Sequence, residues 1–92
     1  MSDILPTPSP SPKPTKVLLI DDNQLSRDVL RTILRDAGYV HIREASAADA
    51  GLKMATYFLP DLICLDVHMP GKSGVALLGE LKVLLPQAVV VM

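Results

Sequence analysis

Short apolar runs alternate with amphipathic segments along this chain, and this alternation restricts the possible folds more than any other feature. Three of the runs are "KVLLID" from Lys16, "DLICLD" from Asp61 and "AVVVM" from Ala88. Continuous apolar runs of this kind are typical of strands that are covered on both faces of a sheet. Because strands that alternate with helices form parallel sheets with right-handed crossovers, the chain is predicted to have an α/β fold.

The segments between these runs predict three helices and one further strand, in the order βαβαβαβ. The helices are expected over 23–38, 46–59 and 74–85, and the further strand is "YVHIREA". Apolar and polar residues alternate in that strand, which favours an edge position near 40–42. The strands at 17–21 and 61–66 are apolar throughout, so we expect them at the centre of the sheet.

The first helix has the clearest pattern. Leu25, Val29 and Ile33 form an apolar face at helical spacing, and an opposite charged side is expected to face solvent. The charged residues are Arg27, Asp28, Arg31 and Arg35. Asn23 suits the N-cap position, and Gly38 suits the position that follows the helix.

The other two helices have weaker signals. Ser46 and Asp49 stand three residues apart, which is the spacing of a capping box at the start of the second helix. The third helix is expected to stop at Pro86, because proline interrupts a helix. Five leucines of the third helix are expected to face the core: Leu77, Leu78, Leu81, Leu84 and Leu85.

The composition predicts one domain that follows a separate leader. The chain has 92 residues, 49% of them hydrophobic, and a mean hydropathy of +0.33, which favours a real core within a single domain. Residues 1–15 carry a proline at every second position from Pro6 to Pro14 and are expected to form an extended, flexible leader. Residues 16–92 are expected to form the domain.

Charge and cysteine content exclude several classes of protein. A net charge of −1 and a pI of about 6.0 provide no electrostatic attraction to nucleic acid or to an anionic membrane. No apolar run reaches the length of a membrane span. The single cysteine, Cys64, lies in a predicted strand and is interpreted as a core residue, which favours a reducing, cytoplasmic location.

Three carboxylates stand at the ends of predicted strands. Asp21 and Asp22 close the first strand, and Asp66 closes the third. Ligands of open α/β sheets bind beyond the carboxyl ends of the strands, so these residues should converge if the two strands are neighbours. Close carboxylates repel one another unless a cation compensates, and a hard divalent ion such as Mg²⁺ suits them.

Two other phosphate chemistries fit the loop after Asp66 poorly. Gly71-Lys72-Ser73 has the end of a nucleotide-binding P-loop, but Asp66 stands where that motif needs its first glycine, and Pro70 lacks an amide donor. A phosphatase of the haloacid dehalogenase type would need a second aspartate two residues after the first, where this chain has His68.

Two segments resemble a known family. "VLLIDDNQLSRDVL" and "LICLDVHMPGKSG" resemble the receiver domain of response regulators, which act in bacterial two-component signalling. The paired acids and the later Asp-x-x-Met-Pro-Gly-x-x-Gly carry the resemblance, which extends from Lys16 to Met92. It implies a three-layer, flavodoxin-like parallel sheet with strand order 2-1-3-4, truncated after the fourth strand.

The resemblance also implies roles for particular residues. Asp66 would accept a phosphoryl group from a sensor histidine kinase or a histidine phosphotransfer protein. Mg²⁺ would be held by Asp21, Asp22 and Asp66, together with the backbone carbonyl of His68. The chain would then be a phosphoprotein of a signalling relay, and not an enzyme in the usual sense.

Parts of the family pattern fall beyond Met92: a Ser/Thr after the fourth strand, a lysine on a fifth strand, and a last helix. We therefore expect slow phosphoryl transfer and loss of the usual switch. Leu25, Val29, Ile33 and the strand at 88–92 are expected to lack cover, which predicts a homodimer or a domain-swapped oligomer. A phosphorylation-independent, self-associating interaction module is the alternative function.

Overall fold

The computed structural model describes residues 15–92, so the predicted leader at 1–15 lies outside the described residues except for Thr15. The elements are β1 (Lys16–Ile20), α1 (Gln24–Asp36), β2 (His41–Ala45), α2 (Ala48–Phe58), β3 (Leu62–Leu65), α3 (Gly74–Leu84) and β4 (Val89–Val91). Their order is the predicted βαβαβαβ. Within residues 15–92, no helix is both long and apolar enough to cross a membrane.

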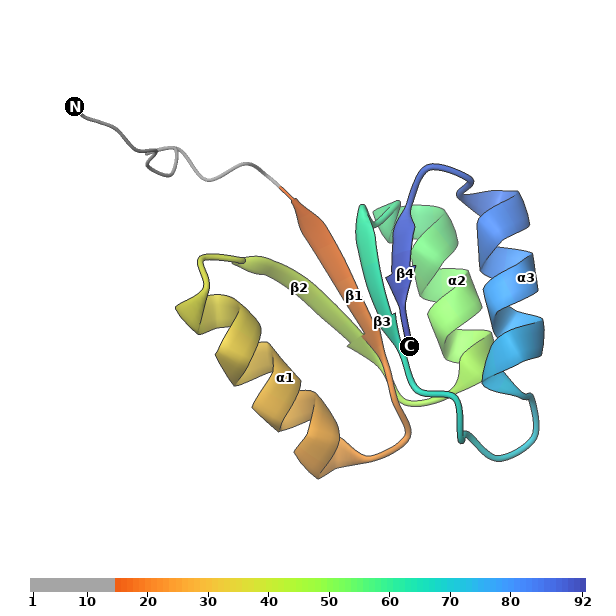
Figure 1. The fold of residues 1–92 in the computed structure, drawn as a ribbon, viewed down its shortest axis with the longest axis horizontal. Helices are drawn as coiled ribbons and strands as arrows, with labels where there is room; N and C mark the ends of the chain where they lie inside the picture. Colours follow the sequence, from red (N-terminus) through yellow and green to blue (C-terminus); the bar gives the residue numbers. More distant parts are fainter. Residues whose placement is uncertain (1–14) are drawn as a thin grey trace.

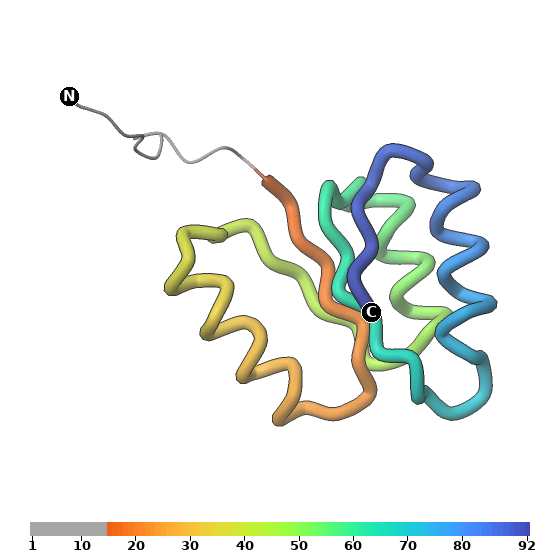
Figure 2. Tube along the Cα trace, in the orientation of Figure 1, coloured from red at the N-terminus to blue at the C-terminus, as the bar shows by residue number. Residues whose placement is uncertain are grey.

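The strands form one parallel sheet in the order β2-β1-β3-β4, as predicted. Helix α1 covers one face of this sheet, and α2 and α3 cover the other, so the fold has three layers (Figure 1). The chain leaves β1 for β2 on one side and later returns to place β3 on the other side (Figure 2). The strand order therefore reverses beside β1, which is where open α/β sheets bind ligands.

The main core lies between the sheet and the helix pair α2 and α3. Its largest fully buried side chains are Leu18, Ile20, Ile63, Leu77 and Leu81. Because alternate residues of a strand point to opposite faces, Val17 and Leu19 point toward α1, and they are fully buried as well. Each such side chain contributes roughly 1.5–3 kcal/mol of transfer free energy. The apolar run of β1 is thus covered on both faces, as predicted.

Helix α1 begins and ends as its sequence predicts. The side chain of Asn23 accepts a hydrogen bond from the Ser26 amide at 2.9 Å, which satisfies one of the free donors at the helix start. At the other end Gly38 follows the C-cap Ala37 with a φ of +103°, a conformation that glycine adopts without strain. These two residues set the length of the helix that follows the acidic pair.

The predicted faces of α1 need one correction. Leu25 is 71% exposed, and Val29 and Ile33 are exposed too, in agreement with the expected lack of cover. The prediction that Arg27 lies on a solvated outer side is wrong, because only 8% of this residue is exposed. Acceptor groups from β2 and from the loop after β1 surround its guanidinium, and these groups draw the arginine inward.

Two smaller predictions about α2 and α3 are also wrong. Helix α2 begins at Ala48 with Ala47 as its N-cap, and no side chain caps it, so Ser46 does not form the predicted capping box. Leu84, expected in the core, is 39% exposed, because it closes α3 at the outer side of a groove. Leu77 and Leu81 carry the apolar contact of this helix instead.

The caps lead to a direct prediction. Ser73 is the N-cap of α3 and accepts a hydrogen bond from the Ala76 amide at 3.1 Å. We expect Ser73→Ala to lower the free energy of unfolding by about 1 kcal/mol. Ser46→Ala is the matched control and should leave it unchanged, because Ser46 caps no helix. Urea unfolding of the two variants measures both values, and equal losses would contradict the assignment of the caps.

Candidate functional site

The three acids predicted from the sequence lie together at one edge of the sheet. Asp21 follows β1 and Asp66 follows β3, and these strands are neighbours in which Ile20 pairs with Leu65. One carboxylate oxygen each of Asp21, Asp22 and Asp66 lies within 4.8 Å of the others. The parallel register therefore brings together residues that are 45 positions apart, as the strand-end argument predicted.

Backbone hydrogen bonds hold the two strand ends in this arrangement. The Asp66 amide donates to the Ile20 carbonyl at 2.9 Å, and the Asp21 amide donates to the Ala45 carbonyl at 3.1 Å. These bonds continue the sheet pattern one residue beyond the strands. Asp21 and Asp66 therefore stand at the same level, directly after the ends of two adjacent strands.

Each strand-end carboxylate also shapes the loop that follows it. Asp21 Oδ1 accepts a hydrogen bond from the Asn23 amide at 2.9 Å. Asp66 Oδ1 accepts one from the His68 amide at 3.0 Å. Aspartate commonly bonds the backbone two residues further on in this way, and the bond turns the chain away from the strand. One oxygen of each carboxylate is thereby oriented, while the other is available to a ligand.

The donor set matches a hard divalent cation. Asp21 and Asp66 are half-buried and Asp22 is exposed, so the site opens to solvent on one side. Three negative charges at this spacing repel one another, and the repulsion favours any cation that bridges them. Carboxylate oxygens are the ligands that Mg²⁺ takes in proteins, usually with several waters. The residues present therefore fit Mg²⁺, and the carbonyl of His68 stays a predicted further ligand.

The loop after Asp66 does not cradle phosphate in the manner of a P-loop. Ser73 caps α3, and Lys72 forms an ion pair with Glu80 of the same helix. Met69 is buried and packs on the core. The Gly71-Lys72-Ser73 segment thus makes the turn into α3. The side chains of Lys72 and Ser73 bond to groups of that helix.

Cys64 lies next to the acids without an obvious reactive role. It shares a recess of about 220 Å³ with Asp21, Asp66, Leu30 and other residues. The thiol is half-buried, and this burial raises its pKa above the ordinary value. A raised pKa leaves less thiolate at neutral pH, which agrees with the interpretation of Cys64 as a packing residue.

Arg27 is the residue near the site that the sequence reasoning missed. Its guanidinium donates to the carbonyl of Asp21 at 2.6 Å and to the Glu44 carboxylate at 3.1 Å. A signal for this contact existed in β2, because strand alternation puts Glu44 on the same face as the apolar Ile42. An acid on a covered face needs a cationic partner, and an arginine of α1 was the available one.

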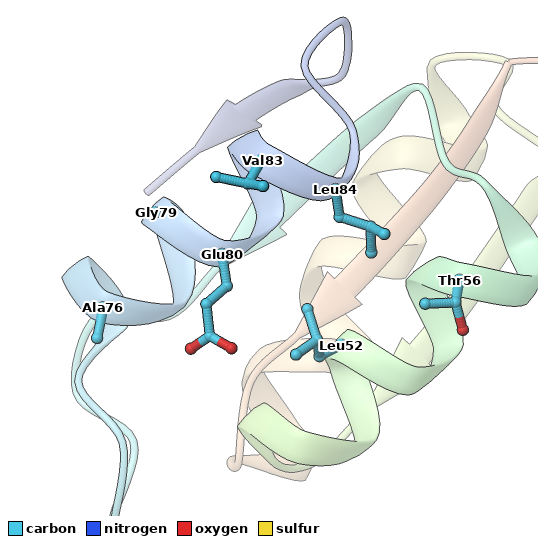
Figure 3. Close-up of a pocket in the computed structure, with 7 residues that line it drawn as sticks. All are labelled: Leu52, Thr56, Ala76, Gly79, Glu80, Val83 and Leu84. Carbon is cyan, nitrogen blue, oxygen red and sulfur yellow. The ribbon is translucent and has the colours of Figure 1, made fainter.

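A second cavity lies far from the acids. A groove of about 600 Å³ runs between α2 and α3, as Figure 3 shows. Its lining residues are Leu52, Thr56, Ala76, Gly79, Glu80, Val83 and Leu84. Its one carboxylate, that of Glu80, forms an ion pair with Lys72, and most of the other lining residues are apolar.

The fold and the acidic edge together define a flavodoxin-like α/β domain with a cluster of three aspartates at the switch point of its sheet. The model of the response regulator receiver domain matches residues 17–92, and the chain belongs to this family. Protein CcdB of Bacillus subtilis is 33% identical over 78 residues, which is 85% of this chain and 65% of CcdB. An uncharacterized response regulatory protein of Vibrio parahaemolyticus is 42% identical over 65 residues, which is 70% of this chain and 27% of that protein.

A solved structure agrees with the sequence relatives. The response regulator TrrA of Thermotoga maritima, in complex with Mg²⁺ and BeF, has a TM-score of 0.77 and is 32% identical. The match covers 83% of this chain and 65% of TrrA. This chain therefore spans less than two thirds of the length of each of these three proteins.

Proposed function

We propose that this chain is a phosphoacceptor of a two-component relay, in which Asp66 takes a phosphoryl group from a sensor histidine kinase or a histidine phosphotransfer protein. Receiver domains in general accept phosphoryl groups in such systems. The observation that carries the proposal is the convergence of Asp21, Asp22 and Asp66 within 4.8 Å at the carboxyl edge of the sheet. A cytoplasmic location goes with this function.

The transfer needs one nucleophile and a compensated negative charge. A free oxygen of Asp66 attacks the phosphorus, the bond from phosphorus to the donor's imidazole nitrogen breaks, and the electron pair returns to that nitrogen. Asp66 Oδ1 accepts a hydrogen bond from the His68 amide, and this bond orients the carboxylate for the attack. Asp21, Asp22, Asp66 and the His68 carbonyl would hold Mg²⁺. The bound ion would neutralise charge on the transferring phosphoryl group.

No catalytic turnover is proposed for this chain, whose part in the relay is that of the group acceptor. A relative of Maricaulis maris is named a protein-glutamate methylesterase/protein-glutamine glutaminase, but this chain spans only 23% of it. That name is therefore not carried over. The alternative of a phosphorylation-independent module is not favoured by the family match.

The test is incubation of the protein with a small acyl phosphate, followed by intact mass measurement. We expect one phosphoryl adduct with Mg²⁺ and none after chelation, because the acid cluster needs its cation for transfer. Failure to form any adduct with Mg²⁺ present would overturn the proposal. An adduct that forms equally well in the presence of a chelator would contradict the role of the metal.

The proposal includes self-association of the 92-residue chain, as a homodimer or by exchange of elements. Val89 and Val91 of the edge strand β4 are exposed, and the register places them on the α1 side of the sheet. Helix α1 lies on this side of the sheet (Figure 1), and its residues Leu25, Val29 and Ile33 are exposed. A strand edge beside an apolar helix face favours pairing with another chain.

We expect light scattering to show a concentration-dependent dimer that Val29→Lys weakens, because a lysine would lose its hydration in the contact. Val83→Lys is the matched control, since Val83 is 85% exposed but lies on α3, on the opposite face. A wild-type chain that stays monomeric over a wide concentration range would refute self-association. An oligomer that survives Val29→Lys would instead indicate exchange of elements.

A further inference from the structure

Arg27 connects helix α1 with the edge strand β2 and with the loop that follows β1. Its Nε donates to Glu44 Oε1 of β2 at 3.1 Å, and one terminal nitrogen donates to the carbonyl of Asp21 at 2.6 Å. The other terminal nitrogen donates to Gln24 Oε1 at 2.6 Å. The planar fork of a guanidinium satisfies three acceptors in different directions, and a lysine ammonium on its single stem does not reproduce this geometry.

These contacts hold the peptide groups of Asp21 from both sides. Its amide donates to Ala45 of β2, and its carbonyl accepts from Arg27, which is itself held by Glu44 of β2. The edge strand β2 thereby helps to fix the chain where it turns after β1, together with the hydrogen bond from the Asn23 amide to Asp21 Oδ1. Asp22 follows directly within this turn, so its direction depends on the same contacts.

We propose that Arg27 is a positioning residue for the acidic pair: it fixes the loop after β1 so that Asp21 and Asp22 converge with Asp66. Arg27 donates to the backbone of that loop and makes no hydrogen bond to the three carboxylates within residues 15–92. The part of the inference that concerns metal affinity rests on the proposed function. The part that concerns the loop stands on the geometry alone.

A neighbouring arginine separates positioning from a general contribution to stability. Arg31 also forms an ion pair with Glu44, but its other partner is Asp28 of α1, and its hydrogen bonds within residues 15–92 do not reach the acidic loop. Arg27→Met and Arg31→Met therefore both remove a cation from Glu44. Only the first also removes the hydrogen bond to the carbonyl of Asp21.

The experiment measures two quantities on each variant by NMR. The first is the hydrogen exchange of the Asp21 and Asn23 amides without metal, and the second is the Kd of Mg²⁺ from amide shifts. Arg27→Met should raise the Kd about tenfold and Arg31→Met less than about twofold, by analogy with other residues that orient metal ligands. Of the two methionine variants, only Arg27→Met should show faster hydrogen exchange of the Asp21 and Asn23 amides. Arg27→Lys should resemble Arg27→Met, because it keeps the charge and loses the fork.

The outcomes separate the positioning role of Arg27 from the proposed phosphoacceptor function. Equal effects of the two methionine variants, or an unchanged Kd in Arg27→Met while the wild type binds Mg²⁺, would overturn the positioning role and leave the proposed function intact. If the wild type binds no Mg²⁺, the metal in the proposed function fails, and amide exchange alone decides about the loop. Should Arg27→Met not fold, Glu44→Gln takes its place, because it weakens the hold on Arg27 and keeps the side-chain shape.

Discussion

Asp66→Asn is expected to abolish the phosphoryl adduct that the wild-type chain forms with an acyl phosphate and Mg²⁺. The amide lacks the anionic oxygen that attacks phosphorus, so no covalent product forms at this position. The substitution also removes one of three charges that lie within 4.8 Å of one another, which weakens the hold on the cation. Intact mass under identical conditions measures the result.

A matched substitution elsewhere controls for general effects of losing a carboxylate. Asp49 is exposed in the first turn of α2, outside the acidic cluster, and Asp49→Asn should form the adduct as the wild type does. An adduct that persists in Asp66→Asn would show that another residue accepts the phosphoryl group. Peptide mapping would then identify that residue.

Gly74→Ala is expected to destabilise the fold by about 1–3 kcal/mol, the usual cost of forcing a carbon into a packed position. An added Cβ would lie 2.6 Å from the Cα of Val67 and 3.1 Å from the carbonyl oxygen of Asp66. Both are backbone atoms, so no side-chain rotation relieves the contact. The start of α3 or the loop after Asp66 has to move, and a lower urea midpoint with an unchanged m-value would report the loss.

Gly79→Ala makes the same chemical change within the same helix and should act in the opposite direction. Apart from the chain neighbours of Gly79 and the backbone of its own helix, no heavy atom of the described residues lies within 4 Å of a Cβ added there. Alanine in a helix interior is more stable than glycine by roughly 0.5–1 kcal/mol. A destabilised Gly79→Ala, or a neutral Gly74→Ala, would contradict the packing of α3 described above.

The close approach at Gly74 also links stability to the site. A Cβ added at Gly74 would meet Asp66 and Val67, the first two residues of the loop after β3. A shift of the helix start would displace the carboxylate of Asp66 from the other acids. Gly74→Ala should therefore form the phosphoryl adduct more slowly than Gly79→Ala, even under conditions in which both are folded.

Much of the fold was predictable because its signals are local. The continuous apolar runs of β1 and β3 identified the two central strands of the sheet, and alternation in β2 identified an edge strand. Asn23 and Gly38 predicted the ends of α1, since capping and a positive φ depend on the residue and its nearest neighbours. Ser46 led to a wrong prediction because its spacing to Asp49 matches a capping box, whereas α2 begins at Ala48 with Ala47 as its N-cap.

The amino-acid sequence by itself determined the order of the elements, the family, and the three acids at the ends of neighbouring strands. Only the tertiary structure decided that Arg27 is buried. Helical periodicity shows which residues share a face, but the burial of a charge depends on acceptors from other elements. Here Glu44 of β2 and the carbonyl of Asp21 supply those acceptors, and they meet Arg27 only when β2 pairs with β1.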